Sequence, residues 1–192
     1  MYRFTALVFA ITLFSGVAHA QKPATGGWEA ASGWGDPQNQ PLSPEGYTYA
    51  GVLSIGHKSY RTGNYTEAIV QYEKAKMMAM ERPYAYYFIA ATQSQLKQYD
   101  EAVANLRTAA TLAGDIDPAF SAKCIYFMAV VFERAENWEQ AKFAWAEYLN
   151  SPGAQYFPHN AIAEAHIAGI ENKFLLEKQY QIVKDRAGNT TR

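Results

Sequence analysis

The sequence predicts an all-α fold in which three helix pairs stack side by side and a C-terminal helix closes the stack. A tetrapeptide pattern, an aromatic residue followed by two polar residues and alanine, occurs at residues 65–68 and returns 34 positions later at 99–102. A third copy, at 138–141, lies 39 positions further on. Of the 192 residues, 49% are hydrophobic and 18% are charged, as in an ordinary globular domain. A repeated unit of this length indicates a stack of similar structural pieces.

Residues 1–20 are predicted to be a secretory signal peptide. Arg3 supplies a positive charge, residues 4–18 are mostly apolar, and residues 18–20 match the A-x-A cleavage pattern. An uncleaved anchor is the alternative, but this apolar run would span only about 22 Å of a hydrocarbon core about 30 Å thick. Cleavage would leave 16 basic and 18 acidic side chains, a formal charge of -2. The prediction is therefore a periplasmic or secreted protein.

Residues 21–46 are predicted to form a flexible arm. They are rich in Gly, Pro, Ser, Asn and Gln and show neither helical nor strand periodicity. Trp28 and Trp34 stand out in this arm, because exposed tryptophans can anchor a docking contact. The alternative is that both side chains fold back onto the first helix pair.

Small and large side chains recur at matching positions in the predicted helix pairs, which together with the closing helix span residues 47–186. In each second helix an alanine is followed four residues later by a large side chain: Ala68 and Tyr72, Ala102 and Leu106, Ala141 and Trp145. The alanines let two helices approach closely, and the large residues fill the groove of the neighbour.

This pattern resembles the tetratricopeptide repeat, a helix-turn-helix unit, over roughly residues 46–152. In repeat one, Ile55 and Gly56 match the family's Leu-Gly pair. Repeats two and three carry Ala90 and Ala129 at the position of Gly56. The resemblance implies that the three repeats form a right-handed superhelical stack.

Turn residues separate the predicted helices. Gly63 and Asn64 suit a left-handed stop between the two helices of repeat one. Repeats two and three have Lys97 and Glu136 in place of the glycine, so their turns must rely on other chemistry. Prolines can occupy the first turn of a helix, because their missing N–H breaks no helical hydrogen bond there. Three of them mark predicted helix starts: Pro83, Pro118 and Pro158.

A closing helix is predicted from His159 to about Arg186, followed by a disordered tail at 187–192. A stack of repeats leaves its last apolar face bare, so this helix should have a polar outer side. An ideal helix would turn Lys173 and Glu177 toward the apolar stripe, which predicts that the helix bends or leaves the stack near Phe174. A fourth, degenerate repeat is the alternative.

The resemblance implies that the first helices of the repeats line a concave groove that binds a protein or peptide partner. Position by position, it assigns these partner-binding residues: Leu53, His57, Tyr60, Arg61, Tyr84, Tyr87, Phe88, Lys123, Tyr126, Phe127 and Arg134. Such a groove suits a peptide with apolar side chains, and its three cations could hold an acidic group at the edge. The alternative is that the aromatic residues of repeats two and three pack between helices or against the arm.

No catalytic or metal-binding motif is found. HExxH, GxSxG, GxGxxG and the P-loop are absent from the sequence. His159 and His166 would lie roughly 10 Å apart on one helix, too far to hold one ion. Cys124 is the single cysteine, which excludes an intramolecular disulfide, and it is predicted to be a buried, inert thiol rather than a reactive one.

The sequence therefore predicts a non-catalytic, exported scaffold or assembly adaptor that binds a protein or peptide and needs no cofactor or metal. A formal charge of -1 gives no reason to expect a nucleic-acid partner, and no membrane span is predicted after signal cleavage. Two other functions stay open. One is a self-associating structural subunit, in which the arm of one chain fills the groove of another. The other is an all-α envelope hydrolase whose residues converge from separate helices.

Overall fold

The computed structural model describes residues 42–189, which are all-α. The part of the chain that it describes contains seven α-helices and one short 3-10 helix: α2 (Tyr49–Arg61), α3 (Tyr65–Met78), α4 (Pro83–Gln95), α5 (Tyr99–Ala113), α6 (Pro118–Arg134), α7 (Trp138–Asn150), η2 (Pro152–Gln155) and α8 (Asn160–Asn189). The predicted signal peptide, residues 21–41 of the predicted arm and residues 190–192 of the predicted tail lie outside the described residues.

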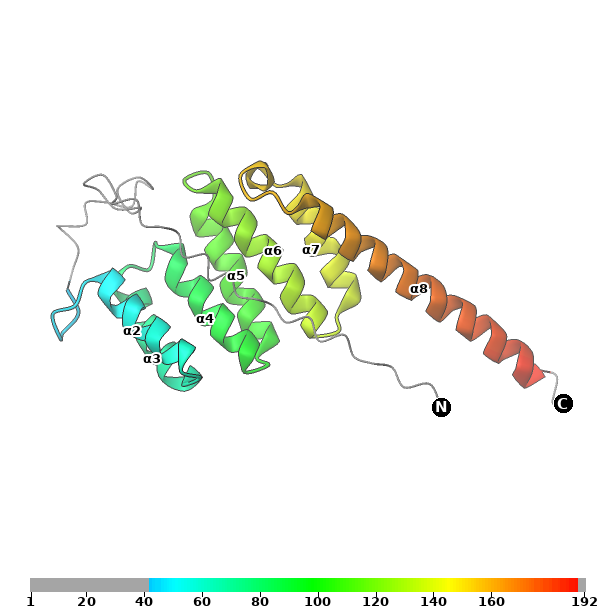
Figure 1. Ribbon diagram of the computed structural model, residues 1–192, viewed down its shortest axis with the longest axis horizontal. Helices are drawn as coiled ribbons and strands as arrows, with labels where there is room; N and C mark the ends of the chain where they lie inside the picture. The colour runs from blue at the N-terminus through cyan, green and yellow to red at the C-terminus, as the bar shows by residue number, and fades with distance from the viewer. Residues whose placement is uncertain (1–41, 190–192) are drawn as a thin grey trace.

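The helices lie side by side in chain order, from α2 at one end of the stack to α8 at the other (Figure 1). Each helix packs against its neighbours in the sequence, as expected for a repeat stack. The core extends through the stack in two clusters. One cluster, between α2 and α4, contains the buried side chains of Tyr49, Tyr72 and Ile89, and the other, between α4 and α8, contains those of Leu106 and Trp145. The predicted fold class, a stack of three helix pairs with a closing helix, is confirmed.

The repeated alanines occupy equivalent places in the three helix pairs. Ala68, Ala102 and Ala141 begin the buried sides of α3, α5 and α7, and each is fully buried. The large residue four positions later is also buried in every repeat. Because a helix completes a turn in about 3.6 residues, both side chains lie on the same face, which packs against the first helix of the pair.

The three turns between paired helices share one backbone conformation although only one of them contains glycine. Gly63 has a φ of 77°, and the residues at the same place in repeats two and three, Lys97 and Glu136, have φ values of 62° and 57°. Repeats two and three therefore make the same left-handed turn with a residue other than glycine. The left-handed conformation costs such a residue roughly 1–2 kcal/mol. Asn64 and Asn137 then cap α3 and α7 by accepting a hydrogen bond from a backbone N–H three residues later.

Two of the three predicted proline starts coincide with helix starts. Pro83 and Pro118 are the first residues of α4 and α6, and Asp117 caps α6 by accepting a 2.9 Å hydrogen bond from the Phe120 N–H. Pro158 lies before α8, which begins at Asn160. The backbone N–H groups of the first turn of α8 reach back to His159, whose carbonyl accepts two of them.

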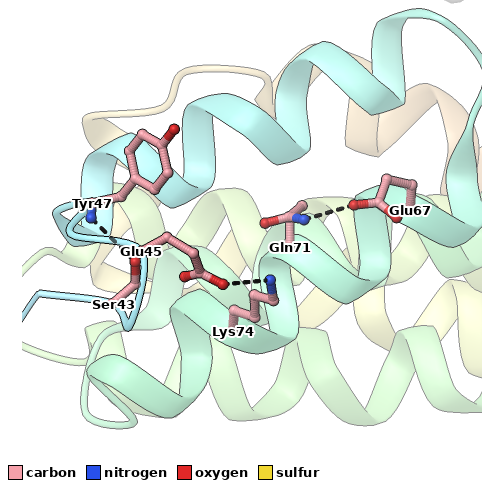
Figure 2. A network of polar contacts seen from close by, with 6 residues as sticks. All are labelled: Ser43, Glu45, Tyr47, Glu67, Gln71 and Lys74. Atoms are coloured by element: carbon pink, nitrogen blue, oxygen red, sulfur yellow. Dashed lines mark hydrogen bonds and ion pairs between the residues drawn. The ribbon is translucent and has the colours of Figure 1, made fainter.

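The folded part of the chain begins before the predicted boundary at residue 47. Ser43 is buried, and its hydroxyl accepts a 3.1 Å hydrogen bond from the Tyr47 N–H. Glu45 forms a 3.2 Å ion pair with Lys74 of α3, as Figure 2 shows. Residues 43–46 therefore form an ordered turn that lies against α3 instead of ending the flexible arm.

The two halves of α8 have different surroundings. In the first half, Ala163 and Ile170 are buried and Phe174 is half-buried against the rest of the core. From residue 175 to residue 187 every side chain is exposed, and Figure 1 shows the helix continuing beyond the stack. The helix thus leaves the stack after Phe174, where the sequence pattern predicted a change. It continues to Asn189, so residues 187–189 are helical and do not belong to a disordered tail.

Hydropathy gives none of these helices a transmembrane character. Within residues 42–189, no helix combines the length and the apolar composition that a bilayer crossing requires.

Candidate peptide-binding surface

The predicted partner-binding residues all lie on α2, α4 and α6, the first helices of the three repeats. Five half-buried rings run across these helices, and we call them the aromatic row: His57, Phe88, Tyr87, Phe120 and Phe127. Their ring centroids follow one another at contact distance. His57 lies 4.2 Å from Phe88, Phe88 lies 5.5 Å from Tyr87, and Tyr87 lies 5.3 Å from Phe120 and 5.7 Å from Phe127. The row joins the three repeats through an apolar surface that keeps part of each ring exposed.

Near the start of α6 the aromatic row carries a positive charge. The Lys123 ammonium lies 4.9 Å from the centre of the Tyr87 ring and 5.8 Å from that of Phe120, within the range of cation–π attraction. Burial lowers the pKa of Lys123. The Tyr84 hydroxyl donates a 3.3 Å hydrogen bond to Asp117, and burial, helped by that carboxylate, raises the pKa of Tyr84. This region therefore combines rings with one partly desolvated cation.

The C-terminal ends of the same helices form a polar, basic region, which we call the basic end: Tyr60, Arg61, Gln95 and Arg134. Arg61 is exposed, whereas Arg134 is half-buried and donates a 2.9 Å hydrogen bond to Ser94. The Tyr60 hydroxyl accepts a 3.3 Å hydrogen bond from Gln95. Burial raises the pKa of Tyr60, and the hydrogen bond from Gln95 and the charge of Arg134 oppose that rise.

The three predicted cations do not form one cluster. Lys123 and Arg134 belong to opposite ends of α6, and eleven residues of helix separate them by about 16 Å. Arg61 and Arg134 both end their helices at the basic end, whereas Lys123 lies on the aromatic row. An acidic group held by guanidinium donors would therefore bind at the basic end, and apolar side chains would lie along the row.

Two predicted residues are placed in packing contacts. Leu53 is 5% exposed and belongs to the core between α2 and α4. The Tyr126 ring lies 4.9 Å from Trp145 and 5.5 Å from Phe157, so the segment before α8 covers it. Tyr87, at the same repeat position, contacts Phe120 and Phe127 of the next first helix but stays half-buried. For Tyr126, the structure therefore favours packing between helices, the alternative to groove binding.

Phe120 and Asp117 were not among the predicted residues, although both contribute to this surface. The repeat register assigns the first helix of repeat three a start near residue 122, as in repeats one and two. The helix α6 instead begins at Pro118, so it is one turn longer than α2 and α4 and brings Phe120 against Tyr84 and Tyr87. Pro118, which marked a helix start in the sequence, was the signal for this extra turn.

Two reactive side chains near this surface are buried or already engaged. Cys124 is buried, and burial raises the pKa of its thiol. The His57 Nδ1 lies 2.7 Å from the Tyr72 hydroxyl, and burial, followed by the charge of Arg61, lowers the pKa of His57. Within residues 42–189, no three His, Cys, Asp or Glu side chains are grouped to hold a metal ion. The side chains that this surface presents are rings and guanidinium groups.

Sequence comparison identifies one repeat directly. A family model described as "Tetratricopeptide repeat" matches residues 83–116. These are the bounds that a 34-residue period with Ala90 at its eighth position assigns to repeat two. No curated protein has a sequence that matches this chain significantly.

Solved structures show the same fold. The first tetratricopeptide repeat domain of Spaghetti (RPAP3) bound to the HSP90 peptide SRMEEVD superposes with a TM-score of 0.55 at 19% identity, covering 66% of this chain and 93% of that one. The Sgt2 repeat domain from Aspergillus fumigatus gives 0.55 at 19% identity, covering 73% and 86%. The Yersinia enterocolitica type III secretion chaperone SycD with a peptide of the translocator YopD gives 0.51 at 15% identity, covering 64% and 91%.

Proposed function

Since the chain is a tetratricopeptide repeat protein, with one repeat matched by sequence and three helix pairs in its fold, we propose that it is a non-catalytic scaffold or assembly adaptor that binds a peptide segment of another protein. The aromatic row and the basic end are the binding surface. The peptide carries apolar side chains, which lie on the row, and an acidic group, which Arg61 and Arg134 bind.

The observation that carries this proposal is the division of the surface into two chemically different parts. Rings from three separate helices form a contiguous row, and a partly exposed row of this kind offers apolar area and shape to a ligand. Two arginines lie at one end of it, where an exposed guanidinium can bind a carboxylate through two parallel hydrogen bonds. Together these parts fix both the identity and the direction of a bound segment.

Structures with this fold support peptide binding as its use. The Spaghetti domain was solved with an HSP90 peptide and SycD with a translocator peptide. The HSP90 peptide, SRMEEVD, contains three acidic residues beside apolar ones, which is the composition expected for the ligand of this surface. The proposal for this chain rests on its own rings and arginines.

Export to the periplasm or to the extracellular space is part of the proposal. It is supported by the charged start, apolar run and A-x-A pattern of residues 1–20. Intact mass and N-terminal sequencing of protein recovered from the native host would test it. A mature chain beginning at Gln21 is the expected result, and a full-length chain retained in the cytoplasm would refute export.

Site-specific photocrosslinking in the native compartment tests the binding surface. A photoreactive side chain at Gln95, which is exposed at the basic end, should capture a discrete polypeptide that mass spectrometry can identify. The same group at Thr108, exposed on α5, is the matched control and should capture none.

The arginine contribution is measured in the same assay. Arg61→Glu should lower the yield at Gln95 at least tenfold, because a charge-assisted hydrogen bond contributes about 1.5–3 kcal/mol and is replaced by repulsion. Arg107→Glu makes the same charge change at an exposed position of α5 and should leave the yield unchanged. Equal yields from Gln95 and Thr108, or equal effects of the two charge reversals, would refute the proposed surface.

A further inference from the structure

The part of α8 that lies beyond the stack carries an apolar stripe without a covering element in the described chain. Leu176, Tyr180 and Val183 are 64%, 70% and 62% exposed. The spacing of four and three residues places these side chains along one line of an α-helix. A solvated helix normally has polar residues at such positions, so this stripe is suited to pack against another helix.

The stripe does not continue the side of α8 that packs on the stack. Ala163, Ile170 and Phe174 face the core in the first half of the helix. At about 100° per residue, that side is continued by Glu177, Gln181 and Asp185, and the stripe is turned away from it by more than a quarter of a circle. Gln181 and Asp185 satisfy each other through a 2.9 Å hydrogen bond. A helix docked on the stripe would therefore meet no obstacle from α7.

A shallow hollow extends this stripe toward the stack. Trp138, Ala165, His166, Gly169 and Lys173 line it together with Glu133 and Ile170. A side chain added at Gly169 would meet no atom within 4 Å, so the floor of the hollow is open on this side. The hollow lies next to the start of the stripe along α8.

The charges beside the stripe favour a second copy of the same helix in antiparallel orientation. Glu177 and Lys184 lie on the same flank, each one residue after a stripe residue, and Glu177 also forms a 2.9 Å ion pair with Lys173 of its own helix. When two identical helices pair antiparallel, residues of one flank face the same flank of the other copy. With the two-fold axis near residues 180–183, Glu177 of each copy lies beside Lys184 of the other, and two complementary ion pairs form.

We propose that this chain self-associates through the exposed half of α8, which pairs antiparallel with α8 of a second copy. Leu176, Tyr180 and Val183 form the contact. The contact is independent of the peptide-binding surface on α2, α4 and α6, so failure of one proposal leaves the other standing. Because the stripe is short, the dimer is expected to dissociate reversibly in the micromolar range or above.

Sedimentation equilibrium over a wide concentration range tests the stripe. The purified protein should show a monomer–dimer equilibrium, and Leu176→Glu with Val183→Glu should raise its dissociation constant at least a hundredfold. The matched control is Leu175→Glu with Ile182→Glu, which adds the same charge at two exposed apolar residues on another side of the helix. Circular dichroism should show all three proteins equally folded. A monomer at every concentration, or equal loss in both double variants, overturns the proposal.

Charge reversal distinguishes a second copy from any other occupant. Glu177→Lys and Lys184→Glu should each weaken the dimer, because like charges then face each other twice. An equal mixture of the two single variants should associate at least tenfold more tightly than either alone, and the double variant should recover the original affinity. A heterologous partner, or residues 1–41 of the same chain lying on the stripe, predicts no recovery in the mixture and would overturn self-pairing.

Disulfide crosslinking fixes the orientation. Cys124 is buried, so a cysteine introduced at Tyr180, near the two-fold axis, should crosslink with its own equivalent. A cysteine at Gly169, far from the axis, should not. Self-crosslinking at both positions indicates parallel helices and overturns the antiparallel arrangement.

Discussion

The two ends of the stack use glycine in different ways. In repeat one, a Cβ at Gly56 would lie 2.5 Å from the ring of Tyr72, and Gly63 supplies the left-handed turn. Repeat three has Ala129 and Glu136 at these two positions. At that end, the glycine that the packing requires is Gly153 in η2, because a Cβ there would overlap the carbonyl group of Pro118 at the start of α6. The comparison shows that the opposing atoms, rather than the repeat position, determine where glycine is required.

The histidines at the two ends differ as well. His57 of repeat one contacts the Tyr72 hydroxyl and the Phe88 ring, in a half-buried site. At the other end, the His166 Nδ1 lies 2.7 Å from a Glu133 oxygen, and its ring stacks on Trp145 at 4.7 Å. The two imidazoles therefore have different partners, a hydroxyl and a phenyl ring at one end and a carboxylate and an indole at the other. Burial lowers the pKa of His57, because an apolar surrounding disfavours the charged imidazole.

The largest effect is expected from Gly153→Ala. Backbone atoms of α6 must move to admit the methyl group, so the free energy of unfolding should fall by about 3 kcal/mol or more. Urea unfolding followed by circular dichroism measures the change. Gly169→Ala is the control: it lies in open space within α8 and should raise stability by roughly 0.5–1 kcal/mol. Similar effects of the two substitutions would contradict the packing described for η2.

A smaller loss is expected from Gly56→Ala, because the obstacle is a side chain. The Tyr72 ring is in the core and must shift, at a cost of about 1–3 kcal/mol. Repeat two combines alanine with leucine at these positions, so Tyr72→Leu should make Gly56→Ala less costly. A double-mutant cycle on the free energy of unfolding measures this coupling. If the effects of the two substitutions simply add, the Tyr72 ring is not what excludes a side chain at position 56.

The turns offer a test with opposite signs at the two ends. Gly63→Ala should lower the free energy of unfolding by about 1 kcal/mol, since a Cβ disfavours the left-handed conformation. Glu136→Gly should raise the free energy of unfolding by ~0.5 kcal/mol. Relief of the left-handed strain stabilises the folded state by more than the added conformational entropy stabilises the unfolded chain. Thermal and urea unfolding of both variants provide the measurement. Destabilisation by Glu136→Gly would mean that the Glu136 side chain stabilises the fold by more than its left-handed conformation costs.

The smallest effect concerns acid. The folded-state pKa of His57 is lowered, so between this value and the ordinary value near 6.5 the unfolded chain binds more protons than the folded one. The stability contribution of neutral His57 is complete above pH 6.5 and is lost as the pH falls toward the folded pKa. His57→Gln lacks this titrating group, so its stability should fall less than that of the parent protein between pH 7 and pH 5. A constant difference would show that His57 does not titrate on unfolding.

The architecture followed closely from the sequence because its determinants are local and repeated. Ala68, Ala102 and Ala141 recur with large residues at fixed spacing, and this pattern encodes which helix faces meet. The sequence also predicts the exit of α8 from the stack, since Lys173 and Glu177 interrupt the apolar side of the helix that faces the core. In the structure, Lys173 lies 5.1 Å from the Trp138 ring and pairs with Glu177.

The candidate binding surface could be predicted less completely from the sequence, because it depends on contacts between repeats. The position shared by Tyr87 and Tyr126 could be assigned from the period, but not the cover that Phe157 provides over Tyr126. The extra first turn of α6, which adds Phe120 to the aromatic row, also breaks the repeat register. These features depend on the length of each helix and on its neighbour, and neither is encoded within one repeat.

The contact between Glu133, Trp145 and His166 determines where the chain can be shortened. One carboxylate oxygen of α6 receives the indole N–H of α7 at 2.7 Å and contacts the imidazole of α8. A chain cut before Asn160 would expose the indole face and leave that oxygen with a single protein donor. A chain cut after Phe174 would retain the whole arrangement, and residues 175–187, which it would lack, are all exposed. The part of α8 after Phe174 can thus be removed without disturbing this contact. Its removal would test the folding of the repeat domain separately from the proposed pairing of α8.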